Sequence, residues 1–127
     1  MWKNKLEVVS EARDDQTWIY TLSGSLFGST EGYAFQDEVR EKIAGGVKKI
    51  VIDLAAVNKI DSSGIGILVA MMWSASSGGV GLVLASLSNT VEKVLSIAML
   101  IDHIDHADTV PDALARLDGM KLEAKPS

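Results

Sequence analysis

The chain has 127 residues, of which 47% are hydrophobic and 23% charged, a composition typical of a single globular domain. It contains no cysteine, which excludes disulfides, thiolate metal sites and cysteine nucleophiles, so the simplest expectation is a reducing, cytoplasmic compartment. The formal net charge of -5 argues against a nucleic-acid-binding protein, because such proteins present a basic face.

Residues 6–11 and 17–22 predict an antiparallel β-hairpin near the start of the chain. Polar residues 14–16 supply the turn, and Trp18, Tyr20 and Leu22 alternate onto one face of the second strand. A loop of small residues, 24–30, follows the hairpin.

A first helix is expected between Thr30, a favourable N-cap, and the Gly45-Gly46 pair, which ends it. Residues 40–42 lie off its apolar stripe and are expected to face solvent. The stripe recurs every four residues, at Phe35, Val39 and Ile43.

Residues 48–54 form a β-branched run typical of a central strand. A helix over residues 63–77 follows, and residues 80–85 give a second buried strand. A strand, a helix and a strand in succession predict a parallel pair joined by a right-handed crossover.

A third helix is expected to begin at Ser88 or Asn89, because Asn89 and Glu92 have capping-box spacing. Residues 104–107 predict a short strand. The run Thr109-Val110-Pro111-Asp112 opens a last helix through Leu117, with Pro111 in its first turn. The predicted inner face of the third helix consists of Val91, Val94, Leu95, Ala98 and Met99.

These elements predict an α/β fold, a mixed β-sheet with an N-terminal hairpin, a central parallel βαβ unit and about four helices. No repeat or linker divides the chain, so we expect one domain over residues 1–127, with a core from about 6 to 117 and a polar tail over 118–127.

The stretch from Ser62 to Val91 carries no formal charge, which raises the question of a membrane span. Its longest apolar run, residues 65–73, has nine residues and is followed by small polar residues and glycines, whereas a spanning helix needs about 20 apolar residues. No apolar run of signal-peptide length follows the first five residues. We therefore predict no membrane span.

The motif Asp61-Ser62-Ser63-Gly64 lies where the central strand leads into the uncharged helix. One interpretation is structural, because a serine at a helix start accepts a hydrogen bond from an exposed backbone N–H. The other is functional, because α/β sheets tend to place their sites at the carboxyl ends of parallel strands. A phosphate on Ser62 would be favoured by the helix dipole and disfavoured by Asp61, so it is expected to act on a partner interface rather than on stability.

The helix that follows this motif has no charge to mark a solvated face. Gly64 and Gly66 leave little bulk beside the serine hydroxyls, which would let another protein approach the backbone closely. The predicted core stripe comprises Ile65, Leu68, Val69 and Met72. Further apolar side chains surround the cylinder at Ile67, Met71 and Trp73. Either both faces are buried within the domain, or one forms an exposed patch for a partner.

The run from Lys49 to Leu54, then six residues, then Asp61-Ser62-Ser63-Gly64-Ile65-Gly66, resembles the signature of the STAS domains (sulphate transporter and anti-sigma factor antagonist). The likeness extends from about Leu6 to Leu117 and includes the order of elements. In the anti-sigma factor antagonists of this family, the serine directly after the aspartate is phosphorylated by a partner that is both kinase and anti-sigma factor. The unphosphorylated form binds that partner and frees the sigma factor.

This resemblance implies that Ser62 is the phosphoacceptor, with Ser63 as the second choice. It implies an anti-sigma factor/serine kinase as the partner, and a serine phosphatase as a further candidate. The residues that it places at the partner-binding surface are Phe27, Asp61, Ser62, Ser63, Gly64, Ile65 and Ile67.

The chain departs from the family after the second strand. The family often carries an acidic residue there, in a Gly-Glu-Leu-Asp-like run that helps contact the kinase. This chain reads Gly24-Ser25-Leu26-Phe27, with Phe27 at the place of the aspartate. The departure implies a more apolar contact with the partner.

Other function classes have weaker support. The main alternative is a non-switching STAS subunit of a lipid-transport ABC system or a sensory scaffold complex, in which the uncharged helix is a permanent contact. No phosphate-binding loop, dinucleotide fingerprint or catalytic constellation is present. His103 and His106 have the spacing of a weak metal site, but a solvated pair is expected. We therefore predict neither an enzyme nor a bound cofactor or metal.

Overall fold

The computed structural model describes residues 5–120 of the chain. Five strands form one sheet in the order β1-β2-β3-β4-β5. Strand β1 pairs with β2 in antiparallel fashion, and every other neighbouring pair is parallel. The strands are β1 (Glu7–Asp14), β2 (Thr17–Leu26), β3 (Lys49–Ile60), β4 (Gly81–Ala85) and β5 (His106–Ala107). This topology confirms the predicted mixed sheet with its N-terminal hairpin.

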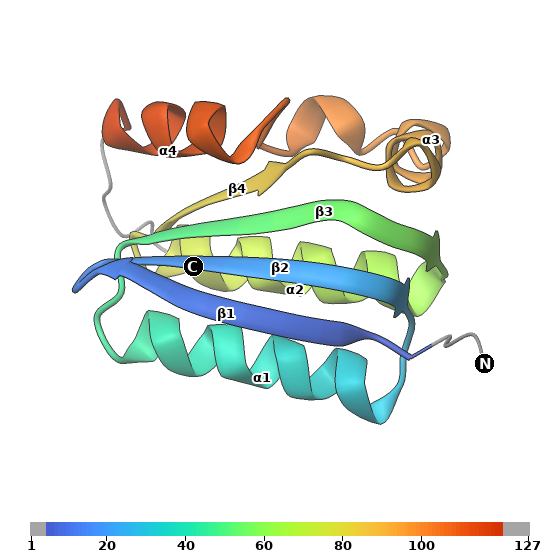
Figure 1. Ribbon diagram of the computed structural model, residues 1–127, viewed down its shortest axis with the longest axis horizontal. Coiled ribbons are helices and arrows are strands. Elements are labelled where there is room, and N and C mark those ends of the chain that lie inside the picture. The colour runs from blue at the N-terminus through green and yellow to red at the C-terminus, as the bar shows by residue number, and fades with distance from the viewer. Residues whose placement is uncertain (1–4, 121–127) are drawn as a thin grey trace.

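The helices are α1 (Thr30–Ala44), α2 (Ser62–Ser77), α3 (Asn89–Ile97) and α4 (Val110–Asp118), with a short 3-10 helix at Ile101–His103. Helices α1 and α2 run side by side on one side of the sheet, and α4 packs on the other (Figure 1). Helix α3 packs against β3. In residues 5–120, every helix falls short of the length or apolar character needed to cross a membrane.

Strand β3 is the centre of the core because both of its faces are covered. Ile50 and Ile52 point into the larger apolar cluster, which also contains side chains of α1 and α2. Val51 points the other way, into a smaller cluster with Ala113 and Leu117 of α4. A parallel strand buried on both faces is expected to be an almost continuous apolar run, as this one is.

The predicted inner face of the second strand is confirmed around Tyr20. The Tyr20 ring is fully buried, stacks on Trp18 with centroids 6.4 Å apart, and meets Phe35 of α1 edge-on at 5.6 Å. Its hydroxyl has no hydrogen-bond partner within residues 5–120. Burial, reinforced by the negative charge of Glu38, raises the pKa of this hydroxyl well above its usual value.

The N-cap of α1 differs from expectation, whereas α3 begins at Asn89, one of its two expected starts. Helix α1 is capped by Ser29 rather than Thr30, because the Ser29 hydroxyl accepts from the Gly32 N–H at 3.1 Å. For α3, Ser88 rather than Asn89 is the cap: its hydroxyl accepts from the Val91 N–H at 3.2 Å. The same hydroxyl donates to the Val57 carbonyl at 2.6 Å, which joins the start of α3 to β3.

The predicted inner face of α3 is wrong at its last two positions. The helix ends at Ile97, and both Ala98 and Met99 are exposed. Met99 has φ +59° and is 80% exposed, while the next N–H, of Leu100, bonds back to the Leu95 carbonyl at 2.9 Å. This is a helix-ending turn of the kind that usually places glycine at the left-handed position.

The last helix forms as predicted, with Thr109 as its cap and Pro111 in its first turn. It continues one residue beyond Leu117, to Asp118, whose carboxylate accepts a hydrogen bond from Lys49 Nζ at 2.8 Å. The predicted polar tail beyond Met120 lies outside the described residues.

Candidate functional site

The candidate site forms where two parallel strands end together. Leu26 of β2 and Ile60 of β3 are register partners, and the Asp61 N–H donates to the Leu26 carbonyl at 3.4 Å. The loops that lead into α1 and α2 therefore emerge side by side. Both helices begin at this edge of the molecule (Figure 1).

Asp61, and not Ser62, caps helix α2. Asp61 has an extended backbone, and its Oδ1 accepts a hydrogen bond from the Gly64 N–H at 2.8 Å. The structural interpretation of Ser62 as an N-cap is thus wrong, because the aspartate before it fills that role. Ser62 is the first residue of the helix, is exposed, and forms no side-chain hydrogen bond within residues 5–120.

Gly64 and Gly66 have different roles, although the sequence suggested the same one for both. Gly64 is buried, and a Cβ at this position would collide with the Leu26 carbonyl, so it holds α2 against the end of β2. Gly66 is exposed, and a Cβ there would meet nothing within 4 Å. Only Gly66 leaves backbone open to another protein.

Ser63 faces the α1 side of the site. A Cβ at Gly28 would lie 2.6 Å from Ser63 Cβ, 2.9 Å from Ser63 Oγ and 3.1 Å from the Tyr33 hydroxyl. Gly28 precedes the α1 cap, Ser29, so these contacts bring the two helix starts together. Ser63 is exposed like Ser62, but it has α1 beside it.

Phe27 lies in the loop after β2, at the place where the family that the sequence resembles often carries an acidic residue. Its side chain is partly buried, and its carbonyl leaves no room for a side chain at Gly32. The loop segment 27–29 carries no charge. The wall of the site beside Ser63 is accordingly neutral.

Helix α2 has one buried side and one exposed side, which answers the question that the sequence left open. Only Leu68 of the four predicted stripe residues is fully buried, while Ile65, Val69 and Met72 are half-buried. Ile67, predicted at the partner surface, is 1% exposed and belongs to the core. The buried side of the helix consists of Gly64, Ile67, Leu68, Met71 and Ala75.

The exposed side forms what we call the outer stripe: Ser62, Gly66, Val69 and Trp73. These positions are spaced i, i+4, i+7 and i+11 and so lie in one row along the helix. Trp73 is 70% exposed, an unusual environment for so large an apolar side chain. The stripe has no formal charge, and its N-terminal end is the Ser62 hydroxyl.

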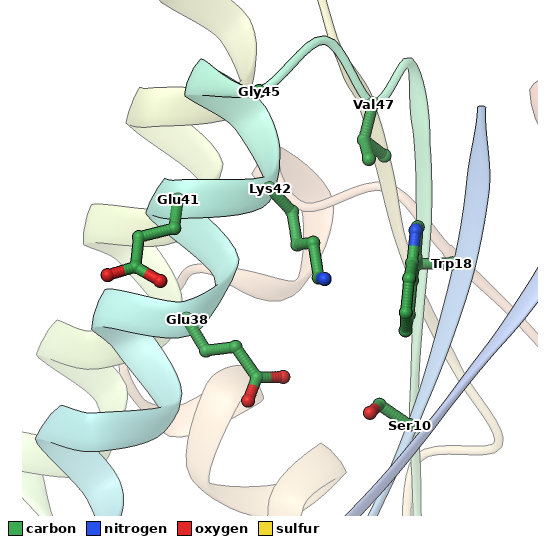
Figure 2. A pocket seen from close by; sticks show the side chains of 7 residues that line it. All are labelled: Ser10, Trp18, Glu38, Glu41, Lys42, Gly45 and Val47. Carbon is green, nitrogen blue, oxygen red and sulfur yellow. The ribbon is translucent and has the colours of Figure 1, made fainter. Parts of the chain in front are cut away.

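A hollow of about 530 Å³ lies elsewhere, between the hairpin and the second half of α1 (Figure 2). Lys42 of α1 stands over the Trp18 ring, with Nζ 3.8 Å from the ring centroid. Glu38 and Glu41 also line the hollow, but the Glu41 carboxylate points away from Lys42 (Figure 2). Lys42 is therefore only partly solvated, contrary to expectation, and the contact joins α1 to β2.

The two histidines lie in different elements. His103 belongs to the 3-10 helix and is exposed, whereas His106 begins β5. Across residues 5–120, no group of three or more histidine or acidic side chains is arranged to hold an ion.

Comparison with known proteins gives one family and several relatives. The model of the STAS domain family matches residues 9–113. A Thermotoga neapolitana protein, the TM1081 homolog, provisionally described as an anti-sigma factor antagonist, is 38% identical over 74 residues. The matched stretch is 58% of this chain and 66% of that protein, slightly less than two thirds of its length.

Among solved structures, the chain resembles the anti-sigma factor antagonist SpoIIAA in its unphosphorylated form, with a TM-score of 0.75 and 22% identity over 90% of this chain and 98% of that chain. It also resembles Bacillus SpoIIAA in the phosphorylated form, with a TM-score of 0.62 and 23% identity over 87% and 99% of the two chains. At these identities the likeness establishes a shared fold.

Proposed function

The chain belongs to the STAS domain family, and from this membership we propose that it is a cytoplasmic anti-sigma factor antagonist switched by phosphorylation of Ser62. In its unphosphorylated form it binds a partner that is both anti-sigma factor and serine kinase, and so frees the sigma factor. A serine phosphatase reverses the modification. The observation that carries the proposal is the exposed Ser62 hydroxyl at the start of α2, which has no hydrogen-bond partner in the described part of the chain.

The role of Asp61 supports Ser62 as the acceptor. Since the aspartate provides the cap through its bond to Gly64, the fold does not need the Ser62 hydroxyl, and a modification there breaks no internal hydrogen bond. A phosphate would be favoured by the positive end of the helix dipole and opposed by the neighbouring carboxylate. Because these effects oppose each other, phosphorylation leaves stability nearly unchanged and acts on the surface that a partner contacts.

The outer stripe is the surface that such a switch would gate. Its uncharged apolar row begins at Ser62 and extends to the exposed Trp73. A phosphate adds a charge of about -1.5 to -2, which a partner with an apolar contact face would have to desolvate. Phosphorylation should therefore release the partner. Phe27, at the place of the family's acid, adds apolar character to the same contact.

The test is phosphorylation by the cognate kinase, followed by mapping of the product by mass spectrometry. We expect modification at Ser62, its loss in Ser62→Ala, and its persistence in the matched control Ser63→Ala. Ser62→Asp should weaken kinase binding, whereas Ser62→Ala should retain it. An unmodified Ser62, together with equal kinase binding by the alanine and aspartate variants, would overturn the proposal.

A second candidate function is the non-switching subunit of a lipid-transport ABC system or sensory scaffold. The exposure of Trp73, three turns from Ser62, favours it, because a permanent contact could use that side of α2 without the serine. Affinity purification from the native organism with phosphosite mapping in the same sample separates the two. Stable recovery of a transporter or scaffold subunit with unmodified Ser62 would select this second function.

A further inference from the structure

Strand β1 lies at the edge of the sheet, and its outer side is open (Figure 1). Within residues 5–120, β2 is the only strand that pairs with it. The opposite edge strand, β5, has two residues, whereas β1 has eight. A long edge strand presents a row of backbone N–H and C=O groups with which another strand can pair. The outer side of β1 is therefore a surface suited to the addition of a strand.

The side chains of β1 alternate between two different faces of the sheet. Val8 packs against the larger apolar cluster and Ser10 lines the hollow beside α1, so the even-numbered residues face α1. Val9 lies on the opposite face and is 67% exposed. Two copies of β1 that are related by a two-fold axis pair in antiparallel fashion, and residues opposite each other then share a face. Such a pairing must join odd positions to odd and even positions to even.

The charges of β1 distinguish between the pairings that remain. Two of them include all but one residue of the strand, one centred on Ser10 and the other on Glu11. The pairing centred on Glu11 sets this residue against Glu11 of the second copy, and like charges directly opposite each other are destabilising. The pairing centred on Ser10 sets Glu11 against Val9, and Glu7 against Arg13. The two-fold axis repeats the favourable pair of opposite charges at the other end of the strand.

The geometry of β1 is compatible with this pairing. The ladder between β1 and β2 is regular from Glu7 to Ala12 and shifts between Ala12 and Asp14. The regular part of the strand contains Ser10 and extends at least two residues to either side of it. Arg13 lies at the irregularity, where its long side chain rather than its backbone would contact Glu7 of the second copy.

We propose that the chain forms a reversible dimer in which two copies of β1 pair along their free edges, in antiparallel fashion and with Ser10 opposite Ser10. The two sheets then become one continuous sheet. This inference goes beyond the proposed function, and the pairing leaves the outer stripe outside the interface, because the stripe belongs to α2. Edge-to-edge pairing buries less surface than a permanent interface, so the dimer depends on protein concentration.

A single introduced thiol tests the pairing, because the chain contains no cysteine. The Cα atoms of opposite residues in an antiparallel pair lie about 4.5–5.5 Å apart, within the range that a disulfide spans. Ser10→Cys should therefore give a disulfide-linked dimer on mild oxidation. Ala12→Cys is the matched control, since it is exposed on the same face but would oppose Val8 of the second copy. It should remain largely a single chain. No linkage in Ser10→Cys, or equal linkage in both variants, would overturn the inference.

Sedimentation equilibrium tests the association of the unaltered chain. The mean mass should rise from one chain toward two as the concentration is raised to about 1 mM. A mass of one chain throughout would contradict the dimer.

Exchange of the charged pair tests the pairing centred on Ser10. Arg13→Glu and Glu7→Arg each place like charges opposite one another, so each variant alone should associate at least about tenfold more weakly. An equimolar mixture of the two should regain the affinity of the unaltered chain, because every altered residue then meets an opposite charge. Circular dichroism verifies that both variants fold. A mixture that associates no better than its components would show that this pairing is wrong.

Discussion

Asp61 Oδ1 and the Gly64 N–H are joined by a 2.8 Å hydrogen bond that closes the first turn of α2. Replacing the cap by alanine, in Asp61→Ala, should lower the free energy of unfolding by about 1 kcal/mol. Asparagine keeps the acceptor oxygen, so Asp61→Asn should stay within a few tenths of a kcal/mol of the wild type. Urea unfolding of the three proteins checks this, and equal losses in both variants would show that the cap is not the cause.

The outer stripe predicts that partner binding and stability can be separated at Trp73. Because this side chain is 70% exposed, Trp73→Ser should change the free energy of unfolding by less than about 0.5 kcal/mol. Affinity for the anti-sigma factor proposed as its partner should fall at least about tenfold, since tryptophans are frequent hot spots of interfaces. Calorimetric titration measures the second effect. The contrasting variant is the buried Leu68→Ala, which should cost about 2–5 kcal/mol of stability.

The backbone conformation of Met99 predicts that its replacement by glycine stabilises the fold. Its φ of +59° is unfavourable for any residue with a Cβ, and its exposed side chain contributes little packing. Met99→Gly should therefore raise the free energy of unfolding by about 0.5–1 kcal/mol. Met99→Ala keeps the Cβ and should bring no gain. A thermal unfolding comparison in which alanine stabilises as much as glycine would contradict this explanation.

The contact of Lys42 with the Trp18 ring should contribute to the docking of α1 on the sheet. Lys42→Met retains most of the aliphatic stem but removes the charge, so it should destabilise by about 0.5–1 kcal/mol, the range of exposed cation–π contacts. Lys42→Arg should be close to neutral. A double-mutant cycle with Trp18→Leu isolates the pair, and a coupling energy of zero would mean that the two side chains are merely adjacent.

The ion pair of Asp118 predicts that the stability of the fold depends on pH in the acid range. A hydrogen bond and positive charge from Lys49 hold the pKa of the Asp118 carboxyl below its ordinary value. Because the folded-state pKa is the lower one, the stabilisation is present above the unfolded-state value of about 3.9 and is lost as the pH falls through the folded-state pKa. Asp118→Asn should thus be less stable than the wild type at pH 7 and approach it at about pH 2. Urea midpoints at the two pH values test this, and a constant difference would exclude the linkage.

The sequence was sufficient to predict the order of helices and strands. Apolar residues recur with a clear period in most elements, and glycine or proline residues mark almost every boundary. Trp18, Tyr20 and Leu22 on one face, and the last helix with its Thr109 cap, followed from local pattern alone. The local pattern did not decide which of two adjacent residues caps a helix. Asp61 and Ser62 are both good caps, and the decision comes from β3, which extends to Ile60 and leaves Asp61 with extended backbone.

The local sequence pattern also could not predict which side of α2 is buried. The sequence of a helix that is apolar around most of its circumference favours no side for burial. The predicted core stripe therefore contains Ile65, Val69 and Met72, whereas the structure buries Ile67 and Met71. The deciding contact is tertiary: Gly64 approaches the Leu26 carbonyl, which fixes the rotation of the helix. Likewise, the apolar period of α3 continued into Met99, but the chain turned away to bring Leu100 and Ile101 against the core.

The register pairing of Leu26 with Ile60 has a consequence for when the chain can be recognised. Gly28, in the loop after β2, and Ser63, in the first turn of α2, are far apart in the sequence, and they meet only after β2 and β3 have paired. An unfolded or newly synthesised chain offers Ser62 as part of a flexible peptide, without the outer stripe that leads to Trp73. A partner that binds this assembled surface would therefore recognise the folded chain and not an unfolded one.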